Sequence, residues 1–147
     1  MASVSEHGKP ARPMRRLAIA FGALAFGLAT WLVVASLGNL VLRFALAGYR
    51  DVEPTMGFTP AMLAARLLLG ALASAACGVA TRVGAGARAP LALASGIVLL
   101  AFFLPAHVAL WDRFPTWYHA AFLASLPLIP AAAARYAPGL RRWRTSR

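Results

Sequence analysis

The chain has 147 residues, of which 61% are hydrophobic and only 13% are charged. About half apolar and a quarter charged is usual for a soluble domain, so the composition excludes an ordinary water-soluble globule and indicates one small membrane domain. The net charge of +11 would favour nucleic acid only if the basic residues formed a water-facing patch. They lie mostly in tails and short connections, so we expect the lipid bilayer and no nucleic acid as a partner.

The N-terminal residues 1–16 are polar and basic, and we expect a disordered tail there. The uncharged run that follows, residues 17–42, is 26 residues long. A bilayer is crossed by about 20 apolar residues, whereas the apolar core of a cleaved signal peptide has about 7–15. The run therefore predicts an uncleaved membrane-spanning helix, with Asn39 and Arg43 at its far end. Residues 43–60 hold charges of both signs and two prolines, and we expect a loop.

The second predicted span, residues 61–80, contains one charged residue, Arg66. Small residues recur in it at four-residue spacing, as Gly70, Ser74 and Gly78. This spacing places them on one helix face, where small side chains let another backbone approach closely. The stripe predicts a tightly packed helix–helix contact. It also motivates an interaction role, with a second copy of the chain or another membrane protein as the expected partner.

A short connection over residues 81–89 leads to the third predicted span, residues 90–111, and the fourth covers residues 115–135. Together the four spans form a predicted transmembrane domain of residues 17–136, followed by a basic tail over residues 137–147. Both spans begin with a proline, and beyond it the third contains Pro105 and the fourth contains Pro127 and Pro130. Each proline removes a backbone hydrogen bond, so we expect both helices to bend.

The distribution of basic residues predicts the orientation of the spans. Of the 15 Lys and Arg residues, four lie in the N-terminal tail, two in the 81–89 connection and five from Arg135 onward. Three lie in the connections on the opposite side, and Arg66 lies within a span. Because basic flanks stay in the cytoplasm, we predict an all-α, antiparallel four-helix bundle with both termini cytoplasmic. The abundance of Arg and Ala favours a bacterial inner membrane.

The third and fourth spans each carry a histidine near the same end, His107 and His119. Both are about 6 Å below the predicted outer ends of their helices, and Arg66 has a similar depth in the second span. Asp112 and Trp117 flank the turn between the histidines. Ionisable groups inside spans are rare and usually face the bundle interior, so these five residues form the candidate binding site.

Structural roles explain the same residues without a ligand. The side chain of Arg66 can reach lipid phosphate at the interface or pair with a neighbouring group, and paired histidines are most often hydrogen-bonded structural groups. Trp111, Trp117 and Tyr118 are typical of an interfacial aromatic belt. Asp112 can cap the fourth helix.

Four ligands are compatible with the residue types of the candidate site. A haem could be held by His107 and His119, and zinc by the same two residues with Asp112, although the tight spacing of zinc ligands is absent and no metal is expected. A quinone or a lipid headgroup could contact Arg66 and His119 through its oxygens, with Trp117 stacking on a ring.

Missing motifs limit the function further. Cys77 is the only cysteine, which excludes an internal disulfide and thiol redox chemistry. No span holds an acid, which disfavours a proton-coupled exporter, and no enzyme signature appears. We expect an accessory, assembly or interaction component without a cofactor. The alternatives are a protein that binds haem or quinone and, less strongly supported, an enzyme in which Asp112 orients His119 as a general base.

Overall fold

The computed structural model of the chain describes residues 12–85 and 89–137, and both of these segments are helical without strands. Most of the two predicted tails lies outside the described residues. The elements are α1 (Arg12–Ala45), α2 (Tyr49–Val52), α3 (Pro60–Ala85), α4 (Ala89–Ala109), the 3-10 turn η1 (Trp111–Arg113) and α5 (Thr116–Tyr136). The all-α prediction is confirmed for this part of the chain.

Four of these helices are long and apolar enough to cross a membrane, with 33, 26, 20 and 21 residues in their apolar stretches. About 20 residues suffice to cross the hydrocarbon of a bilayer. They correspond to the four predicted spans, as expected of a multi-pass membrane protein. α4 remains one helix through Pro105.

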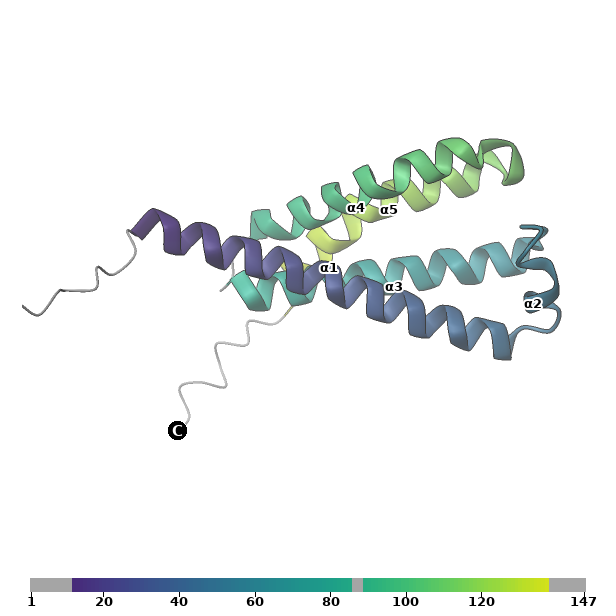
Figure 1. Cartoon of the computed structure of the whole chain (residues 1–147), viewed down its shortest axis with the longest axis horizontal. Helices are drawn as coiled ribbons and strands as arrows, with labels where there is room; N and C mark the ends of the chain where they lie inside the picture. Colours follow the sequence, from purple (N-terminus) through teal and green to yellow (C-terminus); the bar gives the residue numbers. More distant parts are fainter. Residues whose placement is uncertain (1–11, 86–88, 138–147) are drawn as a thin grey trace, which may run out of the picture.

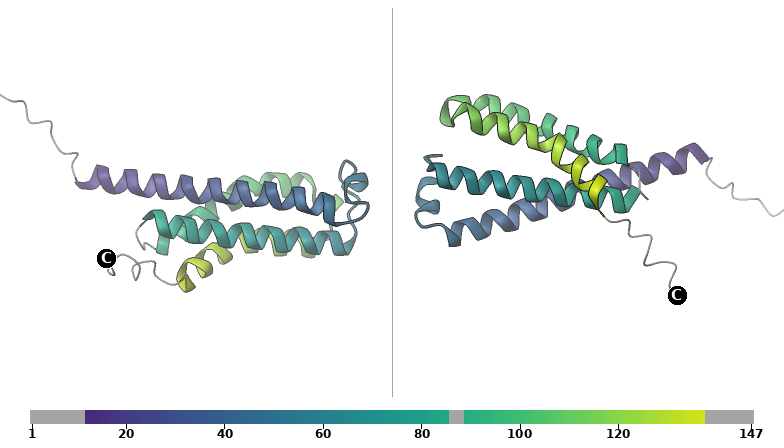
Figure 2. Two further views of the ribbon diagram at one scale, coloured as in Figure 1. Left: turned by 90° about the horizontal axis from the view of Figure 1, so that it is seen from below. Right: turned by 180° about the vertical axis from the view of Figure 1, so that it is seen from behind.

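The helices form two pairs, α1 with α3 and α4 with α5 (Figure 1). The pairs diverge toward the end of the bundle that carries α2 and η1, which we call the α2/η1 end. At the opposite end the first turns of α1 extend beyond the other helices (Figure 2). The buried core lies between the pairs and consists of Trp31, Ala73, Cys77, Leu99, Phe122 and Leu126.

Two of the helices are longer than the hydropathy of the sequence predicts. α1 already begins at Arg12, so Arg15 and Arg16 are helical and do not belong to a disordered tail. Pro13 is no obstacle, because the backbone N–H groups of a first turn have no partner within the helix. α3 continues past its predicted end into the 81–89 connection, of which residues 86–88 lie outside the described residues.

The small-residue stripe of α3 packs inside the bundle. All three of its residues are buried: Gly70, Ser74 and Gly78. The first faces the ring of Phe122 and the last faces the backbone of Pro130, both in α5. The serine hydroxyl accepts a hydrogen bond of 3.2 Å from Nε1 of Trp31 in α1. The close helix packing that the stripe predicts is therefore found within the chain, and the stripe does not indicate a partner.

α5 bends after its two internal prolines, as the sequence predicts. It contains Pro127 and Pro130, and its last turns leave the line of its first half (Figure 2). Nη1 of Arg82, in α3, donates hydrogen bonds to the carbonyl oxygens of Ala134 and Arg135, and the bond to Arg135 is 3.3 Å long. The last carbonyls of a helix have no partner within it and favour a positive charge. Arg82 thus ties the bent end of α5 to α3.

Candidate ligand-binding site

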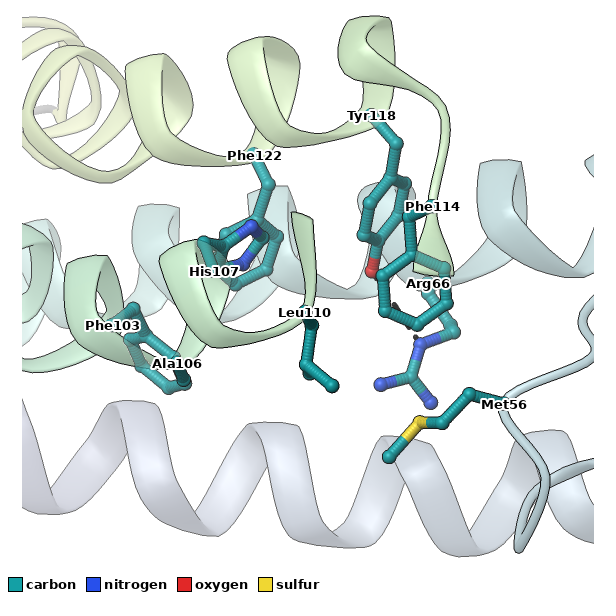
Figure 3. A pocket seen from close by; sticks show the side chains of 9 residues that line it. All are labelled: Met56, Arg66, Phe103, Ala106, His107, Leu110, Phe114, Tyr118 and Phe122. Carbon is teal, nitrogen blue, oxygen red and sulfur yellow. Dashed lines mark hydrogen bonds between the residues drawn. The ribbon is translucent and has the colours of Figure 1, made fainter. Parts of the chain in front are cut away.

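The divergence of the two helix pairs leaves two neighbouring cavities toward the α2/η1 end, with volumes of about 160 and 180 Å³. Both are lined by Arg66, Phe103, Tyr118 and Phe122, and we call the space around these four residues the Arg66 cleft. The first cavity extends toward α4 and the connection after α2, as Figure 3 shows. The second extends toward α1, where Trp31 and other residues line it. The cleft is apolar except for a few groups.

Arg66 is held in position by hydroxyl groups from two other elements. Its Nη1 donates a hydrogen bond of 2.7 Å to Tyr49 Oη in α2, and its Nε donates one of 3.5 Å to Tyr118 Oη in α5. The guanidinium carbon lies 4.6 Å from the ring centroid of Phe58, close enough for a cation–π interaction. The side chain is half-buried, and its guanidinium faces the first cavity (Figure 3).

The carboxylate of Glu53 is bound by two side chains of α1. Its Oε2 lies 2.7 Å from Nε of Arg43, in the one ion pair found among the described residues. Its Oε1 accepts a 3.3 Å hydrogen bond from the amide of Asn39, whose oxygen accepts a 2.9 Å bond from Tyr49 Oη. The hydrogen bonds between Glu53 and Arg66 thus run through two neutral side chains, Asn39 and Tyr49.

The pKa of Glu53 lies below its ordinary value. The main cause is the hydrogen bond from Arg43, which partial burial opposes. The amide of Asn39 and the positive charges of Arg43 and Arg66 lower the pKa further. The carboxylate therefore stays ionised at neutral pH and keeps the segment after α2 attached to α1.

The two histidines of the predicted site form a pair. Their Nδ1 atoms lie 2.8 Å apart, so one ring donates the proton and the other accepts it. His107 stacks on Phe122 at 4.7 Å between ring centroids and lines the first cavity. His119 is fully buried, stacks on Trp111 at 4.6 Å, and its Nε2 has no hydrogen-bond partner in residues 12–85 and 89–137. The hydrogen bond to the buried His119 therefore holds the ring of His107 in place at the cavity wall.

This arrangement does not fit haem or zinc. Two axial nitrogens on opposite sides of an iron are about 4 Å apart, twice a metal–nitrogen bond length of about 2 Å. The Nδ1 atoms of His107 and His119 are closer than that and are hydrogen-bonded to each other, which leaves no room for a metal ion between them. Asp112 is exposed in η1, and no group of three or more His, Cys, Asp or Glu able to hold a metal occurs in the described part of the chain.

The structure brings some of the predicted site residues together and separates others. Arg66 and His107 line the same cavity, and His119 contacts His107 directly. Asp112 and Trp117 line neither of the two cavities, and the side chain of Trp117 is 49% exposed.

Two tyrosines of the site are not found by reading the sequence. The prediction that Tyr118 belongs to an interfacial belt is wrong, because it is only 4% exposed and points into the bundle beside Arg66. Its spacing of four residues from Phe122 was the available signal, since such residues share a helix face. Tyr49 is fully buried under Arg66, and nothing local in its loop sequence indicates this.

No protein-family model, curated protein or solved structure matches the chain. The function is therefore argued from the geometry of the Arg66 cleft.

Proposed function

We propose that the protein is a multi-pass membrane protein that binds a small amphiphilic ligand in the Arg66 cleft. The observation that carries this proposal is that one charged side chain, Arg66, lies on the wall of two cavities whose other walls are almost entirely apolar. Ligand pockets typically combine a hydrophobic lining with a few convergent polar groups. The sequence predicts an accessory role or, as an alternative, ligand binding, and ligand binding fits this geometry better.

The size and polarity of the cleft favour the headgroup of an amphiphile. The polar contributors are Arg66, Tyr118, His107 and Asn39, and the aromatic walls lie beside them. Each cavity, at about 160 or 180 Å³, is smaller than the roughly 300 Å³ needed to enclose a drug-sized ligand. We infer that a headgroup occupies the cleft while the remaining apolar part extends between the helix pairs. A quinone and a lipid both fit this description.

We further propose a bacterial inner membrane with both termini in the cytoplasm. In support, the start of α1, the end of α3, the start of α4 and the end of α5 share one end of the bundle (Figure 1). The basic tails and the 81–89 connection belong to these ends, and basic flanks stay in the cytoplasm. The Arg66 cleft would then lie toward the outer leaflet.

The accessory or assembly role stays a prediction. The small-residue stripe motivated it, and that stripe is occupied by α1 and α5 of the same chain. Chemical crosslinking in native membranes tests it, since a homo-oligomer or a reproducible partner is expected if the role is real. A strictly monomeric protein without a partner would count against it.

Photo-crosslinking tests the ligand-binding proposal. An uncharged 12-carbon alkyl amphiphile carrying a diazirine next to its headgroup is the probe, and mass spectrometry maps the labelled residues. We expect labelling at the cavity walls, in the parts of α1, α3, α4 and α5 that line them. Ala106, which lines the first cavity, and Ala35, which lines the second, are both replaced by Phe to fill the cleft.

The filled variant should lose the cleft labelling while it stays folded. Ala124→Phe is the matched control, because Ala124 is an exposed alanine of α5 that lines neither cavity. Labelling distributed evenly along all helices, or unchanged in the filled variant, would refute ligand binding in the cleft.

A further inference from the structure

Arg66 makes no ion pair with any carboxylate that the structure describes. Its hydrogen-bond partners are the neutral hydroxyls of Tyr49 and Tyr118. The nearest acid of the network, Glu53, makes its ion pair with Arg43. This network therefore holds two guanidinium groups and one carboxylate, and the excess positive charge lies beside the cleft.

The position of Arg66 differs from that of an arginine that merely reaches the membrane surface. A surface-seeking arginine extends its side chain toward water, whereas Arg66 is retained inside the bundle by one tyrosine from α2 and another from α5. An ionised group held among apolar walls is unfavourable without a counter-charge. A bound anion would supply that counter-charge.

Several hydrogen-bond donors around the cleft are available to bind the oxygen atoms of a ligand. A guanidinium has five N–H donors, and Nη2 of Arg66 makes no hydrogen bond to any residue the structure describes. Tyr118 accepts from Arg66, so its own O–H proton remains available, and Tyr118 lines both cavities. His107 adds an imidazole edge to the first cavity (Figure 3). Donors of this kind match an acceptor-only group such as a carboxylate or a phosphate.

We propose that the amphiphile bound in the Arg66 cleft is an anion, with a carboxylate or phosphate headgroup on an apolar tail, and that Arg66 binds this headgroup directly. The inference rests on the proposed function, which requires only that some amphiphile binds. A quinone carbonyl would accept the same hydrogen bonds but would leave the charge of Arg66 uncompensated. Headgroup charge is therefore the property that the cleft selects.

Competition against the uncharged diazirine probe tests the inference. The competitors are dodecyl phosphate, lauric acid and 1-dodecanol, which share one tail length, together with inorganic phosphate, which has no tail. At neutral pH in an uncharged detergent, we expect the two anions to displace the probe at concentrations at least about tenfold lower than 1-dodecanol. Inorganic phosphate should displace none, because the tail contributes to binding.

Variants assign the preference to Arg66. Arg66→Gln should remove the difference between dodecyl phosphate and 1-dodecanol, and Arg66→Lys, which keeps the charge but loses the planar fork, should keep part of it. Arg50→Gln is the control, because Arg50 is an exposed arginine of α2 that lines neither wall of the cleft. In this variant, the difference between displacement by dodecyl phosphate and by 1-dodecanol should equal that of the unaltered protein.

The outcomes separate the two proposals. Equal displacement by dodecyl phosphate, lauric acid and 1-dodecanol in the unaltered protein would overturn the anion inference while leaving ligand binding intact. If inorganic phosphate displaced the probe as effectively as dodecyl phosphate does, the requirement for a tail would be overturned. A probe that never labels the cleft would refute the proposed function itself. None of these comparisons depends on a variant that must fold.

Discussion

At the scale of single residues, the carboxylate of Glu53 leaves Arg66 available by binding elsewhere. Asn39 and Arg43 are four residues apart and so share one face of α1, and both contact Glu53. This attachment positions the α2 connection, which in turn places Tyr49 Oη beneath Arg66. The acid therefore has a structural role, and the arginine of the cleft keeps its charge.

The lowered pKa of Glu53 predicts a loss of stability in acid. A carboxylate whose pKa is lower in the folded state than in the unfolded state stabilises the fold above its unfolded value, near 4.3 for a glutamate, and this contribution is lost as the pH falls through the folded value. We expect Glu53→Gln to lower the melting temperature at about pH 7, and its difference from the unaltered protein to vanish in acid. Thermal unfolding in detergent across the acidic range measures this.

Asp51→Asn is the matched control for Glu53→Gln. Asp51 is an exposed acid of α2 without an ion pair to any described residue. Its substitution should leave the melting temperature almost unchanged at every pH. A Glu53→Gln difference that persists at the lowest pH would show that the carboxylate charge is not the cause.

The buried hydrogen bond between Trp31 and Ser74 should contribute modestly to stability. Its donor and acceptor lie on α1 and α3, in the part of the bundle that forms the core. Hydrogen bonds between membrane helices contribute about 0.6 kcal/mol on average and at most about 1.7 kcal/mol. A double-mutant cycle of Trp31→Phe and Ser74→Ala, followed by unfolding in denaturing detergent, should give a coupling energy in this range. A coupling of zero would mean that the contact is not formed in solution.

At the scale of elements, the bend of α5 depends on glycines of its neighbours. Gly78 of α3 faces the backbone of Pro130, and Gly96 of α4 faces the carbonyl of Leu126 and the backbone of Pro127. A Cβ at either glycine would collide with backbone atoms, which cannot rotate away as a side chain can. The prolines shape α5, and the glycines let α3 and α4 approach it.

Glycine-to-alanine substitutions test this packing. Gly78→Ala and Gly96→Ala should each lower the free energy of unfolding by about 1–3 kcal/mol, the usual cost of overpacking. Gly22→Ala in α1 is the control, since no atom outside the local helix lies within 4 Å of the added carbon. Its stability should stay the same or rise slightly, because alanine is the better helix former. Equal effects at all three sites would contradict close packing at the bend.

At the scale of the whole molecule, the cleft arises because the two helix pairs diverge toward the α2/η1 end (Figure 1). α3 contacts both members of the second pair, and α5 packs along it. The site is therefore built from all four long helices and the α2 connection. Both pairs line the cleft, so a change in the angle between them would alter its walls.

Cysteine labelling tests the proposed orientation. Thr55 is exposed at the α2/η1 end, and the native Cys77 is fully buried, so Thr55→Cys gives a single reactive thiol. A membrane-impermeant maleimide should label this variant in cells whose inner membrane is intact. Protection until the membrane is permeabilised would reverse the orientation and place the cleft at the cytoplasmic leaflet.

The sequence alone determined the elements of this protein, and only the tertiary structure decided how their faces are used. Hydropathy and length are local properties, so four apolar helices were predictable, although α1 and α3 extend beyond their predicted ends. The charge of Arg66 and the matched depths of the histidines were readable for the same reason. The inward direction of Tyr118, the burial of Tyr49 beneath Arg66 and the internal use of the α3 stripe all depend on which helix lies opposite. A pairing through space between segments far apart in the chain leaves no local pattern in a single sequence.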